Sequence, residues 1–179
     1  MDNSRRPCRR SASSARAASV GPRGGGRATT LGRRGGGGTC VVGVGETAVC
    51  PALEQVLAGA ELREPAVDEG LMRSTDDRVV CATAANVFLV RGGVLLTPRI
   101  SDCGVAGVMR EVVLRLAQVL GIHAEIGDYT LDDLARADEC FLTNAVRGIR
   151  PVGCIVGVND FRPGELTARL RDAVETADE

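Results

Sequence analysis

The chain has 179 residues, enough for one domain with a substantial core, and its formal net charge is −1. All 22 basic residues are arginine, so the sequence holds no lysine and offers no side-chain amine for a Schiff base. It contains neither an apolar run of about 18 residues, as a membrane span needs, nor the apolar core of an N-terminal signal peptide, and we therefore expect a cytoplasmic protein.

The near-neutral total hides two unlike parts. Residues 1–38 carry nine arginines against one acid, Asp2, whereas the remainder carries 13 arginines and 22 acidic residues. Because residues 1–38 contain scarcely any large apolar side chain, they cannot bury enough surface to offset the entropy of ordering. We expect residues 1–52 to form a disordered, Arg/Gly-rich segment, followed by a folded domain over 53–179.

A transit peptide or an RNA-binding arm is the functional alternative for this arginine-rich segment, since acid-poor, Arg/Ser-rich sequence is typical of both. No aromatic residue is interleaved to stack on bases, so nucleic acid is not the expected partner. Salt-sensitive retention on RNA would support the arm as a binder.

The seven cysteines lie far apart, with no Cys-x-x-Cys pair. Their spacing matches no metal site, and an odd number without a framework argues against a disulfide-stapled secreted domain. We expect free thiols and no metal.

Regular structure is predicted from about Leu53 onward. The spacing of Leu53, Val56 and Leu57 predicts a short amphipathic helix over 52–62. Short β-branched runs predict strands over 69–73, 78–81, 86–91 and 94–97, and Gly92-Gly93 between the last two is typical of a two-residue hairpin turn.

The second half mixes helices with strands. Val108, Val112, Leu116 and Leu120 form an i, i+4 stripe that predicts a helix over 107–120. A capping-box pattern at Thr130 starts another helix, which reaches about residue 137. The remaining expected elements are strands over 123–129, 140–143 and 151–156, and a helix over 163–176. Without strict βαβ alternation, this order favours a mixed α/β (α+β) domain.

Two loops could bind an anion. The first leads through Gly107 directly into a helix, whose N-terminus offers unpaired N–H groups and the positive end of the macrodipole. In the second, a strand ends at Thr143-Asn144 and opens into a polar turn with hydroxyl, amide and N–H groups. Taken singly, each is equally typical of an ordinary capped turn.

Together the two loops match a family in order and spacing. The matching stretches are Ala84–Val90, Leu96–Arg99, Gly104–Arg110, Ala137–Ala145 and Ile149–Val152. Over roughly residues 53–175 the sequence resembles the C-terminal large domain of fold type IV pyridoxal-phosphate (PLP) enzymes. Within them it is most similar to the aminodeoxychorismate lyase family of folate biosynthesis.

The resemblance implies a cofactor site and a reaction. The N–H groups of Val108 and Met109, with Thr143 and Asn144, would grip the PLP phosphate, and Asn86 would help shape the ring site. Relatives in this family convert 4-amino-4-deoxychorismate to 4-aminobenzoate and pyruvate, and they are usually homodimers. Arg147 and Arg150 flank the Thr143 loop and could meet the carboxylates of a chorismate-derived substrate.

Three departures bear on that chemistry. The family's catalytic lysine is absent, Cys81 stands where the family usually has a glutamate facing the pyridine nitrogen, and residues 1–52 do not resemble the family's N-terminal domain. We therefore expect a chain without catalytic residues of its own. A branched-chain or D-amino-acid aminotransferase of the same fold is the alternative, and a non-catalytic fragment is the second.

The amino-acid sequence before Leu53 is typical of GC-rich DNA translated in an incorrect reading frame. The nucleotide sequence tests this hypothesis, which is wrong if neither alternative frame upstream of the Leu53 codon encodes a Lys-His-Leu-like segment.

Overall fold

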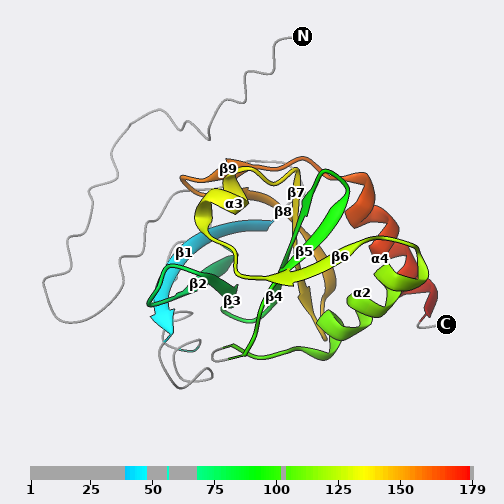
Figure 1. Ribbon diagram of the computed structural model, residues 1–179, viewed down its shortest axis with the longest axis horizontal. Helices are drawn as coiled ribbons and strands as arrows, with labels where there is room; N and C mark the ends of the chain where they lie inside the picture. Colours follow the sequence, from blue (N-terminus) through cyan, green and yellow to red (C-terminus); the bar gives the residue numbers. More distant parts are fainter. Residues whose placement is uncertain (1–38, 48–55, 57–67, 102–103, 178–179) are drawn as a thin grey trace, which may run out of the picture.

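The computed structural model describes residues 39–47, 56, 68–101 and 104–177. In this part of the chain nine strands form one curled sheet in the order β3-β2-β1-β8-β7-β4-β5-β6, with β9 paired to β8 (Figure 1). The strands are β1 (Thr39–Thr47), β2 (Glu69–Ser74), β3 (Val79–Ala82), β4 (Asn86–Arg91), β5 (Val94–Pro98), β6 (Ala124–Gly127), β7 (Glu139–Asn144), β8 (Gly148–Ile155) and β9 (Asn159–Asp160). The helices are α2 (Val108–Val119), α3 (Leu131–Ala135) and α4 (Glu165–Ala177). The predicted mixed α/β class is confirmed.

Strand β4 lies at the centre of the domain and is buried on both faces. Because side chains alternate along a strand, Val87 and Leu89 enter one hydrophobic cluster while Phe88 and Val90 enter another. The two clusters account for the near-continuous apolar sequence of this strand, since neither face meets solvent.

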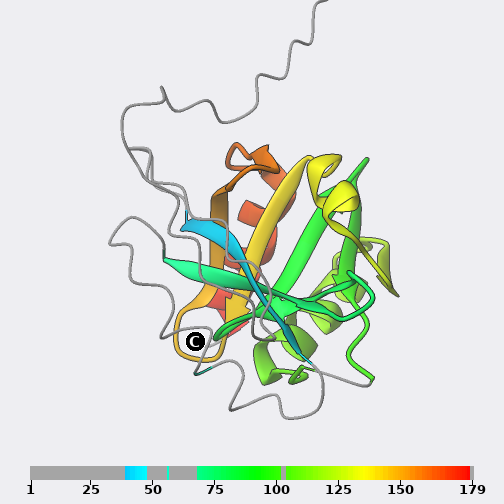
Figure 2. The same ribbon diagram turned by 90° about the vertical axis from the view of Figure 1, so that its left-hand side faces the viewer.

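The first cluster fills the space between the β2–β3 end of the sheet, the central strands and α3, with Leu71, Leu142 and Leu134 among its members. The second lies between the central strands and the helices α2 and α4, which lie together on one face (Figure 1). Turned by 90°, the β1–β2 end crosses in front of the central strands, which shows how strongly the sheet curls (Figure 2). The domain is therefore layered, with the curled sheet folded over one core and two helices covering the other.

The register of β4 against β7 places two pairs on the helix-covered face. Asn86 is opposite Thr143, and Phe88 is opposite Phe141. The two phenyl rings stack with their centroids 5.0 Å apart and their planes inclined by 4°. A polar pair thus follows directly on an apolar pair at the end of these strands, where α2 begins.

The hairpin joining β4 to β5 follows its prediction. Gly92 and Gly93 have φ values of +57° and +81°, the left-handed conformation that two-residue hairpin turns require and that glycine adopts without steric cost. The strands on either side match the predicted ranges to within one residue.

The predicted helix over 107–120 is confirmed as α2, but the stripe that predicted it is not its most buried face, since Val112 and Leu116 pack only partly buried against the second cluster and the two ends are exposed. Val108 is 74% exposed and Leu120 is 36% exposed. Arg110, Val113 and Ala117, spaced by three and four, are the buried positions instead. The small Ala117 and Val113 let the helix axis approach the stacked phenylalanines, which leaves the predicted stripe beside the contact.

One strand occurs where the composition predicted none. Residues 39–47, inside the segment 1–52, form β1, which pairs in parallel with both β2 and β8. The run Cys40-Val41-Val42-Gly43-Val44 is rich in β-branched residues, which gives this stretch a strand propensity that the arginine-rich sequence before it lacks. The other residues of 1–52 lie outside the described part of the chain. So does the predicted helix over 52–62, except Val56.

None of the helices in the described ranges combines the length and apolar character needed to cross a bilayer.

Candidate functional site

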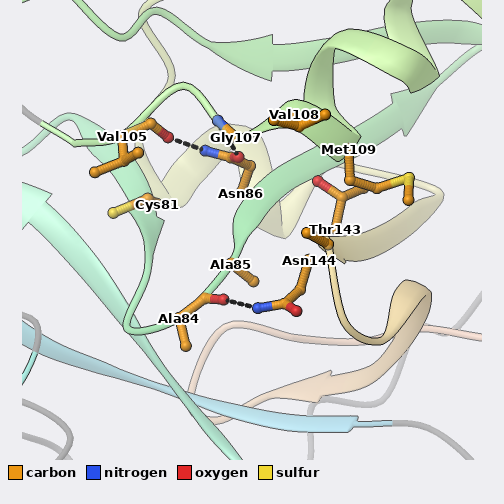
Figure 3. A pocket seen from close by; sticks show the side chains of 11 residues that line it. Cys81, Ala84, Ala85, Asn86, Val105, Gly107, Val108, Met109, Thr143 and Asn144 are labelled. Carbon is orange, nitrogen blue, oxygen red and sulfur yellow. Dashed lines mark hydrogen bonds between the residues drawn. The ribbon is translucent and has the colours of Figure 1, made fainter.

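A cavity of about 230 Å³ lies where α2 begins, beside the ends of β4 and β7 (Figure 3). Its walls come from three stretches of chain that are far apart in sequence. They comprise Cys81, Ala84, Ala85, Asn86, Val105, Gly107, Val108, Met109, Thr143, Asn144 and Ala145. All six residues predicted to hold a cofactor (Cys81, Asn86, Val108, Met109, Thr143 and Asn144) therefore border one cavity.

The N-terminus of α2 opens into this cavity. Gly107 is the N-cap, and no side chain caps the first turn within the described residues. The first N–H groups of any helix have no intrahelical acceptor, so those of Val108 and Met109 remain available to a ligand. Together with the helix dipole they favour an anion.

Thr143 supplies a hydroxyl for which no described residue is a partner. The residue is 2% exposed, and its Oγ1 makes no hydrogen bond within the described part of the chain. Figure 3 shows this side chain directed toward the start of α2, where Met109 lies. Since buried hydroxyls are almost always hydrogen-bonded, an unpartnered one that borders a cavity indicates a missing acceptor.

Asn86 is committed to the loop that precedes α2. Its Nδ2 donates to the carbonyl oxygen of Val105 at 2.7 Å, and its Oδ1 accepts from the N–H of Gly107 at 3.0 Å (Figure 3). A Cβ added at Gly107 would lie 2.5 Å from Asn86 Oδ1, so a larger residue does not fit there.

Asn144 is committed in the same way to the turn between β3 and β4. Its Nδ2 donates to the carbonyl oxygen of Ala84, and its Oδ1 accepts from the N–H of Val146 at 2.8 Å. Asn144 therefore holds the cavity wall with its side-chain amide, whereas the hydroxyl of the adjacent Thr143 has no partner in the described ranges.

Cys81, a residue of β3, forms part of the cavity wall and is 1% exposed. A Cβ added at Gly104, whose φ is +87°, would lie 3.9 Å from the Cys81 sulfur and 2.8 Å from a methyl carbon of Val80. The loop that leads to α2 thus passes close over this strand, and only glycine meets both the conformation and the space.

Arg110 places a positive charge in the first turn of α2. It is 7% exposed, its Nη2 donates to the carbonyl oxygen of Pro98 at 3.1 Å, and its Nε has no partner among the described residues. Burial lowers the pKa of this guanidinium, but arginine stays charged at neutral pH. A buried cation without a carboxylate partner in this part of the chain adds to the positive potential at the helix start.

The N-terminus of α4, on the same face of the sheet, is satisfied differently. The Glu139 carboxylate, at the opposite end of β7 from Thr143, accepts from the N–H of Leu166 at 3.2 Å and from the N–H and Oγ1 of Thr167 at 2.8 and 2.6 Å. In α4 a protein carboxylate occupies the anion position, whereas the corresponding position of α2 faces the cavity.

The two arginines predicted to contact a substrate do not line the cavity. Arg147 is exposed in the turn after Asn144. Arg150 donates from Nη2 to Glu69 Oε2 at 2.9 Å, with the two side chains 17% and 7% exposed. Their contact with substrate carboxylates stays a prediction.

Glu69 is the residue of this region that sequence reasoning missed. Besides Arg150, it accepts from the N–H of Ala84 at 2.9 Å and from the Thr83 hydroxyl, so it holds the turn that forms one wall of the cavity. The signal was a glutamate at the start of the apolar run Glu69-Gly70-Leu71-Met72, where burial of a charge requires partners.

The arrangement suits a phosphate group. It offers the N–H groups of a helix N-terminus and a hydroxyl without a partner among the described residues, which can donate to anionic oxygens, while the charge of Arg110 lies nearby but outside the cavity lining. No group of three or more His, Cys, Asp or Glu side chains that could hold a metal occurs in the described ranges.

Comparisons with known proteins agree on one family. The family model described as amino-transferase class IV matches residues 49–155. The chain is 37% identical over 127 residues to the aminodeoxychorismate lyase of Vibrio harveyi, with 69% of this chain and 47% of that protein covered.

Solved structures give the same grouping. The 4-amino-4-deoxychorismate lyase of Pseudomonas aeruginosa superposes with a TM-score of 0.67 and 42% identity, covering 70% of this chain and 46% of that one. A T.th. branched-chain aminotransferase complexed with N-(5′-phosphopyridoxyl)-L-glutamate gives a TM-score of 0.69 and 25% identity, with 79% and 51% covered. The chain spans about half the length of these relatives.

Proposed function

The chain belongs to the class IV aminotransferase family, a family of PLP-dependent enzymes, and from that premise we propose that its cavity binds the phosphate group of PLP without a covalent bond to the protein. The observation that carries this proposal is the buried hydroxyl of Thr143 beside the start of α2, where no described residue supplies a partner for the hydroxyl or a side-chain cap for the helix. A phosphate oxygen can accept from the Thr143 hydroxyl and from the first N–H groups of α2. The phosphopyridoxyl compound bound by the aminotransferase relative carries a phosphate group.

Each wall of the cavity has a role in this binding. Thr143 Oγ1 and the N–H groups of Val108 and Met109 donate to the phosphate. Asn86 and Asn144 hold the loops on either side by the hydrogen bonds that they make to backbone groups. Cys81 is part of the wall beside the ring. PLP, when bound, supplies the electron sink for chemistry at a substrate amino group.

The residues present fit the phosphate group of PLP but not its covalent attachment. Covalent attachment of PLP needs a lysine amine, and none of the 179 residues is lysine. We therefore propose reversible binding and no turnover by this chain alone, and we assign no catalytic residue.

For the reaction of the family branch we propose the lyase type, in which 4-amino-4-deoxychorismate gives 4-aminobenzoate and pyruvate. The 42% identity to the Pseudomonas aeruginosa lyase, against 31% and 25% to two solved branched-chain aminotransferases, supports this choice. The 37% identity to the Vibrio harveyi lyase does not discriminate, because a putative branched-chain aminotransferase of Methanocaldococcus jannaschii is also 37% identical. A branched-chain aminotransferase is the second candidate, because such enzymes share the fold with comparable TM-scores. A homodimer in the cytoplasm, with a chorismate-derived amine as substrate, is the corresponding biological setting.

Equilibrium dialysis of the purified full chain against PLP tests the binding, with inorganic phosphate as competitor. We expect saturable uptake of PLP that phosphate reverses. Borohydride treatment followed by peptide mapping should give no adduct on any internal residue. Failure to retain PLP contradicts the site, and a stable adduct on any internal residue contradicts non-covalent binding.

Two assays address the reaction. One supplies 4-amino-4-deoxychorismate and measures 4-aminobenzoate, and the other supplies an amino donor with a branched-chain keto acid and measures the amino acid formed. We expect neither product above background from this chain. Product in the second assay alone would replace the lyase assignment with the aminotransferase.

A further inference from the structure

We infer that Asn86 is a positioning residue for the phosphate site, which holds the start of α2 in place through the loop 105–107 and does not itself bind the ligand. The inference rests on the proposed function, because it concerns the same cavity. It assigns Asn86 to the loop, where the sequence predicted a role in shaping the ring site.

Both polar ends of the Asn86 side chain are already used. Nδ2 donates to the Val105 carbonyl oxygen at 2.7 Å, while Oδ1 accepts from the Gly107 N–H at 3.0 Å. A single planar amide thus bridges two backbone groups two residues apart, as a neighbouring strand would. The side-chain amide of asparagine donates and accepts from one rigid group at this reach, and glutamine is one methylene longer.

The strand register makes this bridge relevant to the ligand. Asn86 is opposite Thr143 in the β4–β7 pair, so the two side chains leave the same face of the sheet as neighbours. Asn86 is 5% exposed and sits on a strand buried on both faces, so its own position is fixed. By holding Gly107, it sets where the N–H groups of Val108 and Met109 lie relative to the Thr143 hydroxyl.

The glycine at position 107 supports the same conclusion. Its φ of −71° and ψ of 149° are extended values open to any residue, so the backbone conformation does not demand glycine. The demand is spatial, because a Cβ would lie 2.5 Å from Asn86 Oδ1. Gly107 is thus required by the Asn86 contact, and the two positions should be interdependent.

This interdependence gives the test. Full-chain variants Asn86→Ala, Gly107→Ala and the double variant are compared by equilibrium dialysis with PLP, and by amide hydrogen exchange of peptides covering residues 104–110. We expect each single variant to weaken PLP binding by about tenfold, through loss of the bridge or through the clash. In the double variant the clash is gone, so Gly107→Ala should add little to the loss caused by Asn86→Ala.

Exchange separates positioning from a general loss of stability. In Asn86→Ala we expect faster exchange confined to residues 104–110, with β4, β7 and α4 unchanged. Should that variant fail to fold, Asn86→Asp keeps the shape and the acceptor for Gly107 but loses the donor to Val105. It should show the same local exchange, with a larger loss of PLP binding because of its charge.

The inference is overturned if Asn86→Ala binds PLP as tightly as the wild type, if the two single losses add in full, or if exchange rises across the whole sheet. If the wild-type chain does not retain PLP at all, the proposed function fails. The exchange data still decide whether Asn86 holds the loop.

Discussion

The hydroxyl of Thr143 is the most direct residue-scale test of the phosphate site. It is buried without a partner among the described residues, so the free protein bears the cost of its desolvation, while a bound phosphate would gain a charge-assisted hydrogen bond. Thr143→Val should therefore weaken PLP binding by roughly 10- to 100-fold, as expected for a hydrogen bond to a charged group of about 1.5–3 kcal/mol. The melting temperature of the ligand-free Thr143→Val variant, measured by calorimetry, should equal or exceed that of the wild type.

Thr143→Ser is the matched control, since it keeps the hydroxyl and removes one methyl group. It should bind PLP nearly as well as the wild type, at a stability cost of about 1 kcal/mol. A valine variant that binds PLP normally would exclude Thr143 as a ligand.

At this scale the sequence predicted which residues come together, while their binding of a phosphate stays a prediction. Val108, Met109, Thr143 and Asn144 border the same cavity although about 35 positions separate the two pairs. Sequence reasoning could not foresee that the amides of Asn86 and Asn144 are spent on backbone groups, because partner choice depends on a loop geometry that only the fold defines. The Arg150–Glu69 pair could not be foreseen for the same reason, since the two residues lie 81 positions apart in the sequence.

At the scale of the elements, the N-terminus of helix α4 is stabilised by the carboxylate of Glu139 in strand β7. Glu139→Gln keeps one oxygen acceptor but removes the charge that faces the helix N-terminus. We expect the free energy of unfolding to fall by about 1–2 kcal/mol in urea titrations. PLP binding should be unaffected, because Glu139 lies at the opposite end of β7 from Thr143.

Glu175→Gln in the same helix is the control. Glu175 pairs with Arg171 at 4.0 Å on the exposed surface, where ion pairs contribute little, so its loss should fall below about 0.5 kcal/mol. Equal losses in the two variants would rule out the cap as a special stabiliser of α4.

The elements themselves were largely foreseeable, with limits that have physical causes. Periodicity located α2, the helix expected over 163–176 is α4, and Gly92-Gly93 predicted the hairpin. Which face of α2 is buried could not be predicted from the sequence. The large apolar residues and the smaller Val113 and Ala117 lie on neighbouring faces of the helix, and the smaller pair packs in the cluster that contains the stacked phenylalanines. The two-residue strand β9 was missed, since Asn159-Asp160 has low strand propensity and pairs only because β8 passes alongside.

At the scale of the whole molecule, the ion pair of Arg150 with Glu69 joins β8 to β2 and holds the turn at the cavity wall. Glu69→Gln would leave the Arg150 charge largely buried without a counter-charge. We expect a loss of about 3–5 kcal/mol in the free energy of unfolding, measured in urea.

Glu69→Gln combined with Arg150→Met removes the stranded charge as well. Because an uncharged pair avoids desolvating two ions, the double variant should recover most of the stability lost in the single one. Additive losses would mean that the pair is not coupled. The strand order that creates this pair, with β1 between β2 and β8, was beyond sequence reasoning, since strand propensity does not specify neighbours.

The three separate stretches that wall the cavity have a kinetic consequence. Residues 81–86, 105–109 and 143–145 meet only after β7 has paired with β4 and α2 has docked, contacts that close long loops and therefore form late. A ligand held by all three should not recognise the folding transition state. In stopped-flow experiments, saturating PLP should slow unfolding in proportion to the stabilisation it gives, while the refolding rate stays unchanged. A ligand-accelerated refolding rate would instead place the cavity among the first parts of the molecule to assemble.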